Sequence, residues 1–108
     1  MPMQAGEFWL ADIPFTDGSG TKIRPVLVLW IDGLDAAVAA VTSAAPRTPS
    51  DVVVREWQAS GLRVPSTVRL ARIDCLDQSL LFRRIGVISK SDGQVCKSAW
   101  DAHVKPRF

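Results

Sequence analysis

The segment Lys22-Ile23-Arg24-Pro25-Val26-Leu27-Val28-Leu29-Trp30 decides the fold of this 108-residue chain. Its apolar part is short and rich in Val and Leu, which is the pattern of a buried β-strand. Pro25 restricts its own backbone and favours an extended conformation for the residue before it. The guanidinium of Arg24 is therefore expected at the mouth of a rigid strand.

A small polar loop, Thr16-Asp17-Gly18-Ser19-Gly20-Thr21, is predicted immediately before this strand. Its glycines allow the backbone to come close to a ligand. A fixed guanidinium beside such a loop would suit a phosphate group. The alternative is that Arg24 is an ordinary solvated surface arginine, as most arginines are.

The composition is that of an ordinary soluble globular protein, with 47% hydrophobic and 22% charged residues, and we expect one domain over residues 1–108. No apolar stretch has the length of a membrane span, and the N-terminus does not have the pattern of a secretory signal. A cytoplasmic location and no membrane partner are expected. Cys75 and Cys96 have no metal-ligand spacing, so we expect two small core residues, with neither zinc nor a disulfide.

The net charge is only +2, but arginines are concentrated in the later half of the chain. Between residues 63 and 84 there are five arginines against two acids, namely Arg63, Arg69, Arg72, Arg83 and Arg84 against Asp74 and Asp77. This excess permits a polyanionic partner. A solvated, arginine-rich face explains it equally well.

The pattern of the remaining chain predicts short strands at residues 6–13, 51–57, 66–73 and 86–88, with an irregular or single-turn helical piece at 76–84. Residues 34–43 are ambiguous: the alanines favour a helix, whereas Val38, Ala40 and Thr42 can line one face of a strand.

A capping box at residues 89–92 predicts a closing helix that runs to about residue 103. Val95, Ala99, Trp100 and His103 are expected near one face of this helix. The fold class is therefore mainly β with a C-terminal helix, in a small, strongly bent sheet or barrel.

Four motifs follow one another along almost the whole chain. They are Gly6-Glu7-Phe8-Trp9-Leu10, then the segment from Lys22 to Leu29, then Val41-Thr42-Ser43, and finally Ser60-Gly61-Leu62 to Ile73 with Arg84-Ile85-Gly86. In this order and at compatible spacing they resemble the PemK/MazF family of toxins from bacterial toxin–antitoxin pairs.

The resemblance implies an SH3-like barrel with a terminal helix, assembled as a homodimer, and it makes residues 34–43 a strand. It implies a metal-independent endoribonuclease, or mRNA interferase, that uses no cofactor and cuts single-stranded RNA, often at short preferred sequences. It also implies a partner, a small acidic or partly disordered antitoxin whose C-terminal tail covers the RNA groove.

Cleavage without a metal requires an aligned 2′-hydroxyl, a path for its proton and neutralisation of the charge on the phosphorane. By the resemblance, Arg24 and Thr42 carry this chemistry. A guanidinium offers phosphate a planar fork of donors but is a poor proton carrier, so we assign Arg24 chiefly to transition-state stabilisation. The Thr42 hydroxyl can bond a phosphate oxygen or orient the nucleophile, and Ser43 could assist.

RNA binding by stacking and phosphate contacts is predicted for Phe15, Ser19, Thr21, Lys22, Arg47 and Arg69. Core packing is the alternative for Phe15. Some family members carry an Asp two residues after the arginine that matches Arg69, but this chain has Ala71 there. The early loop also has no His. These departures favour an Arg/Thr site or a weakened enzyme.

Two other functions stay open at this point. The same fold serves non-cleaving toxins of the CcdB type, which poison DNA gyrase, and such a relative would not need the pair of Arg24 and Thr42. An inactive homologue that only binds the antitoxin is also compatible with Ala71.

Overall fold

A computed structural model describes residues 2–15 and 17–108 of the chain. Its strands are β1 (Glu7–Pro14), β2 (Thr21–Asp32), β3 (Asp35–Thr42), β4 (Asp51–Val54), β5 (Ser66–Asp77) and β6 (Leu81–Val87). A 3-10 turn, η1 (Gln78–Leu80), joins β5 to β6, and the helix α1 (Lys90–Ala99) continues into a π-helical turn, η2 (Trp100–Val104). The prediction of a mainly β fold with a C-terminal helix is confirmed.

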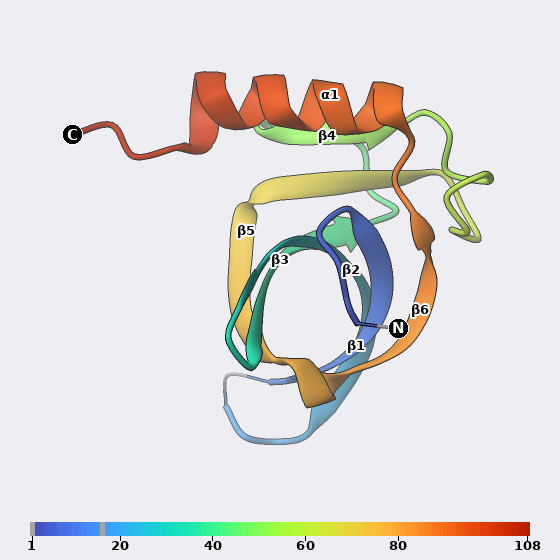
Figure 1. Ribbon diagram of the computed structural model, residues 1–108, viewed down its shortest axis with the longest axis vertical. Coiled ribbons are helices and arrows are strands. Elements are labelled where there is room, and N and C mark those ends of the chain that lie inside the picture. Colours follow the sequence, from blue (N-terminus) through green and yellow to red (C-terminus); the bar gives the residue numbers. More distant parts are fainter. Residues whose placement is uncertain (1, 16) are drawn as a thin grey trace.

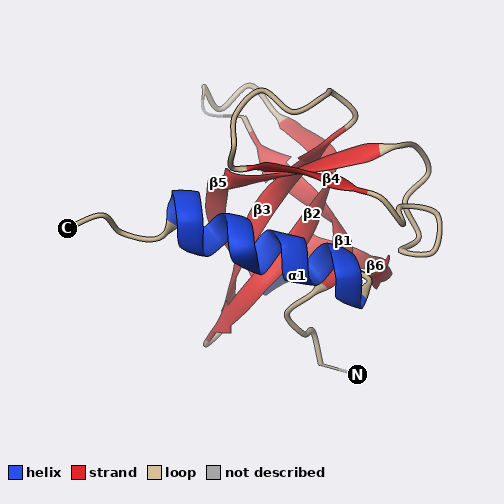
Figure 2. Cartoon of the chain, turned by 90° about the horizontal axis from the view of Figure 1, so that it is seen from above, coloured by secondary structure: helices blue, strands red, loops and turns tan. Residues whose placement is uncertain are grey.

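All six strands form one antiparallel sheet in the order β4-β5-β3-β2-β1-β6. The sheet curls into a barrel, and α1 lies beside β4 at one end of it (Figure 1). Seen from above, the helix crosses the strands and the C-terminal tail extends away from the barrel (Figure 2).

The two edges of the sheet meet where the turn after β4 touches β6. A Cβ on Gly86 would collide with the backbone carbonyl of Ser60, and a Cβ on Gly61, which has φ +89°, would collide with that of Ile85. Only glycine permits this approach of two backbones. The barrel is therefore closed by two glycines: Gly86 lies against Ser60, the residue before Gly61, and Gly61 lies against Ile85, the residue before Gly86.

Replacing Gly86 by alanine is expected to destabilise the protein by about 1–3 kcal/mol, because one of the two backbones must move. Gly93→Ala is the matched control, since its Cβ would meet only Ile88 at 3.7 Å and alanine is the better helix former. Urea unfolding of both variants checks this expectation. Equal stability of the two variants would contradict the closure that we describe.

The alternating side chains of the strands build a separate core on each face of the sheet. Leu27 and Val41, with Phe8, Val68 and Leu70, belong to the cluster that includes Cys96 of α1. The other face holds a second cluster made of Ala11, Val26, Val28, Ala36, Val38 and Leu81. This period of two is what a strand buried on both faces requires.

Asp92 docks the helix on the end of β4. Ser89 caps the helix as predicted, since its Oγ accepts from the backbone N–H of Asp92 at 3.1 Å. The Asp92 carboxylate, only 2% exposed, accepts from the backbone N–H groups of Arg55 and Glu56 at 3.2 and 2.9 Å. Burial of a carboxylate is tolerated because these donors satisfy it.

Several predicted elements are corrected by the structure. Residues 34–43 form a strand, β3, as the resemblance implied, but β4 ends at Val54 and residues 55–60 form turns. The segment 76–84 is not irregular, because β5 continues to Asp77 and β6 already begins at Leu81. Only the single turn η1 separates these two strands.

The predicted helix face is correct for two of its four residues, and one predicted core cysteine is wrong. Ala99 packs on the core and Trp100 is half-buried, but Val95 and His103 are exposed. Val104 packs on the core in place of His103, because the π-helical turn Trp100–Val104 shifts the periodicity there. Cys96 is buried as expected, and its pKa is raised to about 11 by burial and by the Asp92 charge. Cys75 is an exposed free thiol on β5.

Among the described residues, no helix has the length and apolarity needed to cross a membrane.

Candidate active site at one end of the sheet

The registers of the strands bring Arg24 and Thr42 to one face and one end of the sheet. Val26 pairs with Ala40 across β2 and β3, and continuing this antiparallel register by two residues places Arg24 across from Thr42. Residues that face each other across an antiparallel pair point to the same side. The two side chains therefore share the face on which Val26 and Val38 form the second core.

The neighbouring strands add further polar groups to this face. Thr42 pairs with Thr67, Ala40 with Arg69, and Arg69 in turn with Asp51 of β4. The apolar stripe of the second core thus gives way to polar and charged side chains where the strands end. We call Arg24, Thr42, Thr67, Arg69 and Asp51 the end cluster.

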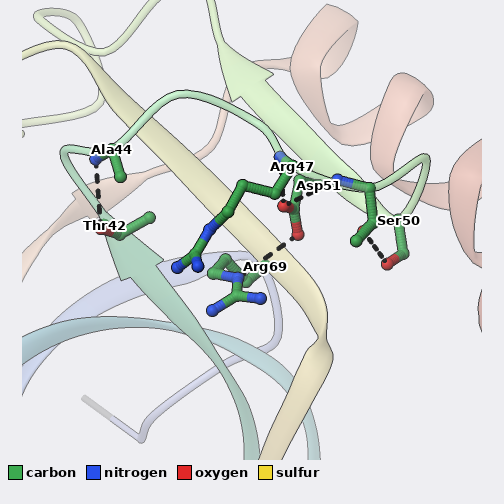
Figure 3. A network of polar contacts seen from close by, with 7 residues as sticks. Thr42, Ala44, Arg47, Ser50, Asp51 and Arg69 are labelled. Atoms are coloured by element: carbon green, nitrogen blue, oxygen red, sulfur yellow. Dashed lines mark hydrogen bonds and ion pairs between the residues drawn. The ribbon is translucent and has the colours of Figure 1, made fainter.

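The Thr42 hydroxyl is oriented by the turn that follows β3. Its Oγ1 accepts a hydrogen bond from the backbone N–H of Ala44 at 3.1 Å (Figure 3). This bond occupies the oxygen as an acceptor and leaves the hydroxyl proton to be donated. Thr42 can therefore serve as a donor to an anion. Ser43 lies just beyond the end of β3 and is exposed.

Asp51 ties the loop of residues 44–50 to β5. Its Oδ2 accepts from the backbone N–H groups of Arg47 and Thr48 at 2.9 and 3.3 Å. Its Oδ1 lies 3.5 Å from Nε of Arg69, an ion pair too long for a good hydrogen bond (Figure 3). The Asp51 side chain is 3% exposed and that of Arg69 is 23% exposed.

The electrostatics of this network keep Asp51 ionised. Burial raises the pKa of the carboxyl, but the hydrogen bonds from the backbones of Arg47 and Thr48 and the charge of Arg69 outweigh it, so the net pKa lies below its usual value. Asp51 is thus a poor proton acceptor at neutral pH and acts as a structural anion.

Asp51→Asn is expected to destabilise the protein at pH 7 by about 1–3 kcal/mol, because charge-assisted hydrogen bonds and an ion pair are removed. A carboxyl whose folded pKa is depressed stabilises the fold above its unfolded pKa of about 3.9, and this contribution disappears as pH falls through the folded value. The difference in free energy of unfolding between wild type and Asp51→Asn should therefore become smaller in acid. Urea unfolding at neutral and acidic pH measures it, and a gap that widens in acid would contradict this assignment.

Three cations of this end have no ion pair among residues 2–15 and 17–108, namely Lys22, Arg24 and Arg47. All three are exposed. In Figure 3 the Arg47 side chain extends from its loop back towards the end of β3, on the side where Arg69 lies. The predicted cation Arg69 belongs to the same end, but its charge is partly balanced by Asp51.

The early loop is closed by backbone hydrogen bonds between Phe15 and Gly20 and between Gly18 and Phe15, at 2.8 and 3.1 Å. Phe15 is 45% exposed and belongs to neither core cluster, so core packing does not explain it. Ser19 and Thr21 are exposed in and beside the loop, and Lys22 follows. Part of the segment, Thr16, lies outside the described residues.

Sequence reasoning missed Asp51 and Thr67. Thr67 is buried beside Thr42, and its alternation with Arg69 along β5 is visible in the sequence. Nothing local marks Asp51, because its partners in the ladder and in the loop come from other segments. In the described part of the chain, no group of three His, Cys, Asp or Glu side chains is placed to hold a metal ion.

Comparison with solved structures finds the same fold in several bacterial toxins. An endoribonuclease in complex with its cognate antitoxin from Mycobacterial species is 16% identical, with a TM-score of 0.75, over 99% of this chain and 100% of the other. The Mycobacterium tuberculosis toxin MazF-mt6 is 23% identical with a TM-score of 0.68, over 87% and 94%. The MazE-MazF complex (Form-III) of Deinococcus radiodurans is 20% identical with a TM-score of 0.71, over 93% of this chain and 94% of the other.

At these identities the likeness establishes the fold, which is the one that the sequence resemblance implied. No curated protein sequence matches the chain. The sequence model of one family, the PemK-like, MazF-like toxins of type II toxin–antitoxin systems, matches residues 4–102. The four motifs, the barrel and the match over nearly the whole chain agree: this protein belongs to the PemK-like, MazF-like family of type II toxins.

Proposed function

We propose that this toxin is an endoribonuclease that cleaves single-stranded RNA at preferred short sequences without a metal. The observation that carries the proposal is the register of β2 and β3, in which Val26 pairs with Ala40, because its continuation by two residues sets Arg24 across from Thr42 on one face. The family match supports it, as do related structures of proteins named endoribonucleases. The family match and the related endoribonuclease structures also favour RNA cleavage over gyrase poisoning and over an inactive homologue.

In the proposed reaction, the ribose 2′-oxygen forms a bond to the adjacent phosphorus and the bond from phosphorus to the 5′-oxygen breaks. The Arg24 guanidinium neutralises the charge that develops on the phosphorane oxygens. Thr42 donates its hydroxyl proton in a hydrogen bond to the same group. Asp51 is buried and ion-paired, and position 71 is Ala, so neither supplies a base. The 2′-hydroxyl proton passes to solvent or to the phosphate, and the departing 5′-oxygen takes up a proton from solvent.

The other predicted residues would bind the strand on either side of the scissile phosphate. Lys22 and Arg47, which have no ion pair within residues 2–15 and 17–108, offer charges for backbone phosphates, and Phe15 offers an exposed ring on which a base can stack. Ser19, Thr21, Ser43 and Arg69 complete the proposed contacts.

We also propose the partners that the family implies. The same cations would attract an acidic segment of an antitoxin, which would then block the RNA site. Two of the similar structures are complexes of a toxin with its antitoxin. A homodimer is the proposed assembly of the toxin itself.

The test is incubation of the pure protein with long single-stranded RNA in excess chelator, followed by mapping of the ends. We expect cleavage at a small set of sequences, leaving 2′,3′-cyclic phosphate ends. A substrate with 2′-deoxyribose at the cleavage position should resist, because its nucleophile is missing. Absence of cleavage of any RNA, or cleavage of the deoxy substrate, would refute the proposal.

A further inference from the structure

A cavity of about 450 Å³ lies close to the end cluster, since its lining includes Pro25 and Ser66, the chain neighbours of Arg24 and Thr67. Its apolar lining includes Leu10, Pro25, Leu62 and Ile85, which we call its floor. Three arginines stand around it, Arg63, Arg83 and Arg84. The volume is within the range of about 300–1,000 Å³ that small-molecule sites have. We call it the arginine pocket.

The walls of the arginine pocket are held in place before any ligand arrives. Leu62 is buried, and its backbone N–H donates to the carbonyl of Trp57 at 3.0 Å. The Ser66 hydroxyl donates to the carbonyl of Val64 at 2.7 Å. The close approach of the Gly61 backbone to Ile85 fixes this wall against β6. A preorganised wall reduces the entropy cost of binding.

The charge of the arginine pocket is positive and mostly unbalanced. Arg84 is held by Glu7, whose Oε2 lies 2.7 Å from its Nε. Arg63 and Arg83 are exposed and have no ion pair within the described residues. No acidic residue lines the cavity in the described part of the chain. Two guanidinium groups therefore remain free to bind an anion, with a flat fork suited to phosphate.

The chain connects the arginine pocket directly to the end cluster. Pro25, in its floor, follows Arg24, and Ser66, in its wall, precedes Thr67. Since neighbouring residues of a strand point to opposite faces, the two sites lie back to back at one end of the sheet. A nucleic-acid strand that passes over this end meets one site after the other.

We propose that the arginine pocket is a nucleotide subsite for the RNA strand whose scissile phosphate lies at Arg24 and Thr42. The inference rests on the proposed function and extends it to a second position of the substrate. A base packs on the apolar floor, while Arg63 and Arg83 bind the flanking phosphate. Proteins hold single strands by combining contacts to the faces of the bases with binding of the phosphates. Occupancy of this subsite contributes to affinity and to sequence preference.

The test compares Arg63→Gln/Arg83→Gln with wild type in binding to two RNAs of about three and about nine nucleotides, both blocked by 2′-deoxyribose at the central step. Glutamine keeps most of the bulk and removes the charge. We expect the affinity of this variant for the longer RNA to fall about tenfold or more. The ratio of its affinity for the longer RNA to its affinity for the shorter RNA should therefore be smaller than that of wild type. The salt slope should decrease by roughly 0.7 for each phosphate that the variant no longer neutralises.

Arg55→Gln/Arg72→Gln is the matched control, because it removes two exposed arginines that do not line the arginine pocket. Its affinity for the longer RNA should stay within about twofold of wild type. Thermal unfolding of both variants verifies the fold. An unchanged affinity and salt slope in Arg63→Gln/Arg83→Gln would overturn the subsite.

A polyglutamate peptide serves as a second probe. If Arg63→Gln/Arg83→Gln weakens binding of this peptide and leaves RNA affinity unchanged, the arginine pocket receives an acidic protein segment, and the RNA subsite is refuted. Cleavage of unblocked RNA by wild type is scored separately. Its absence contradicts the proposed function, whereas unchanged RNA affinity of the pocket variant contradicts the subsite alone.

Discussion

Arg24→Ala is expected to lower kcat for RNA cleavage by about 100- to 1,000-fold. Its guanidinium is the proposed neutraliser of phosphorane charge, and removal of one preorganised donor from such a site costs this much. The residue is exposed and has no ion pair among the described side chains, so the fold should be unaffected. Single-turnover cleavage at saturating protein concentration measures the loss, with unfolding curves as a check.

Two further variants distinguish transition-state stabilisation by the Arg24 guanidinium from a general effect of positive charge at this position. Arg24→Lys keeps the charge but loses the planar fork, so we expect it to recover only part of the activity. Lys22→Ala removes a cation from the same strand and face, and should raise KM more than it lowers kcat. If Arg24→Ala cleaves at nearly the wild-type rate, Arg24 does not act on the phosphate.

Thr42→Val is expected to lower kcat by about 100-fold, because valine has nearly the same shape and lacks the donor. Removing the acceptor of the Ala44 N–H is a smaller effect, since this group is exposed and water can replace the bond. Single-turnover kinetics on the same RNA measure the change.

Thr42→Ser keeps the hydroxyl and should retain most activity, whereas Ser43→Ala tests the adjacent hydroxyl and should have a much smaller effect. A Thr42→Val enzyme as fast as Thr42→Ser would show that the hydroxyl takes no part in the reaction.

The parts of the fold that local patterns determine were predictable from the sequence. The Val/Leu run after Pro25 forms β2, and Ser89 caps α1. Residues 34–43 were ambiguous because alanine favours helix, and only the family resemblance made them a strand. Burial against β2 and β5 overrides the propensity there, since Ala36 to Ala39 are all buried.

Features that depend on distant segments were not predictable. β6 was predicted too short because its outward residues, such as Phe82 and Arg83, show no clear alternation. The sequence predicts a core position for Cys75, but this part of β5 is exposed on the barrel surface. The pairing of Asp51 with Arg69 joins two strands whose register no local pattern reveals. The same holds for the arginine pocket, which assembles residues from four strands and a loop.

The candidate site was predicted in part. The resemblance predicts Arg24 and Thr42 as site residues, and the β2–β3 register, continued by two residues, sets them on one face. Their roles, and those of the RNA-binding residues, remain proposals. Asp51 and the arginine pocket can be identified as parts of the site only from the three-dimensional structure.

The central claim is that the Arg24 guanidinium and the Thr42 hydroxyl act on the same phosphate. A double-mutant cycle on kcat/KM with Arg24→Ala, Thr42→Val and the combined variant tests it most directly. Groups that act as a unit are strongly non-additive, so the double variant should lose little more than Arg24→Ala alone. A loss equal to the product of the two single losses would show that the two residues act independently, and would contradict the account.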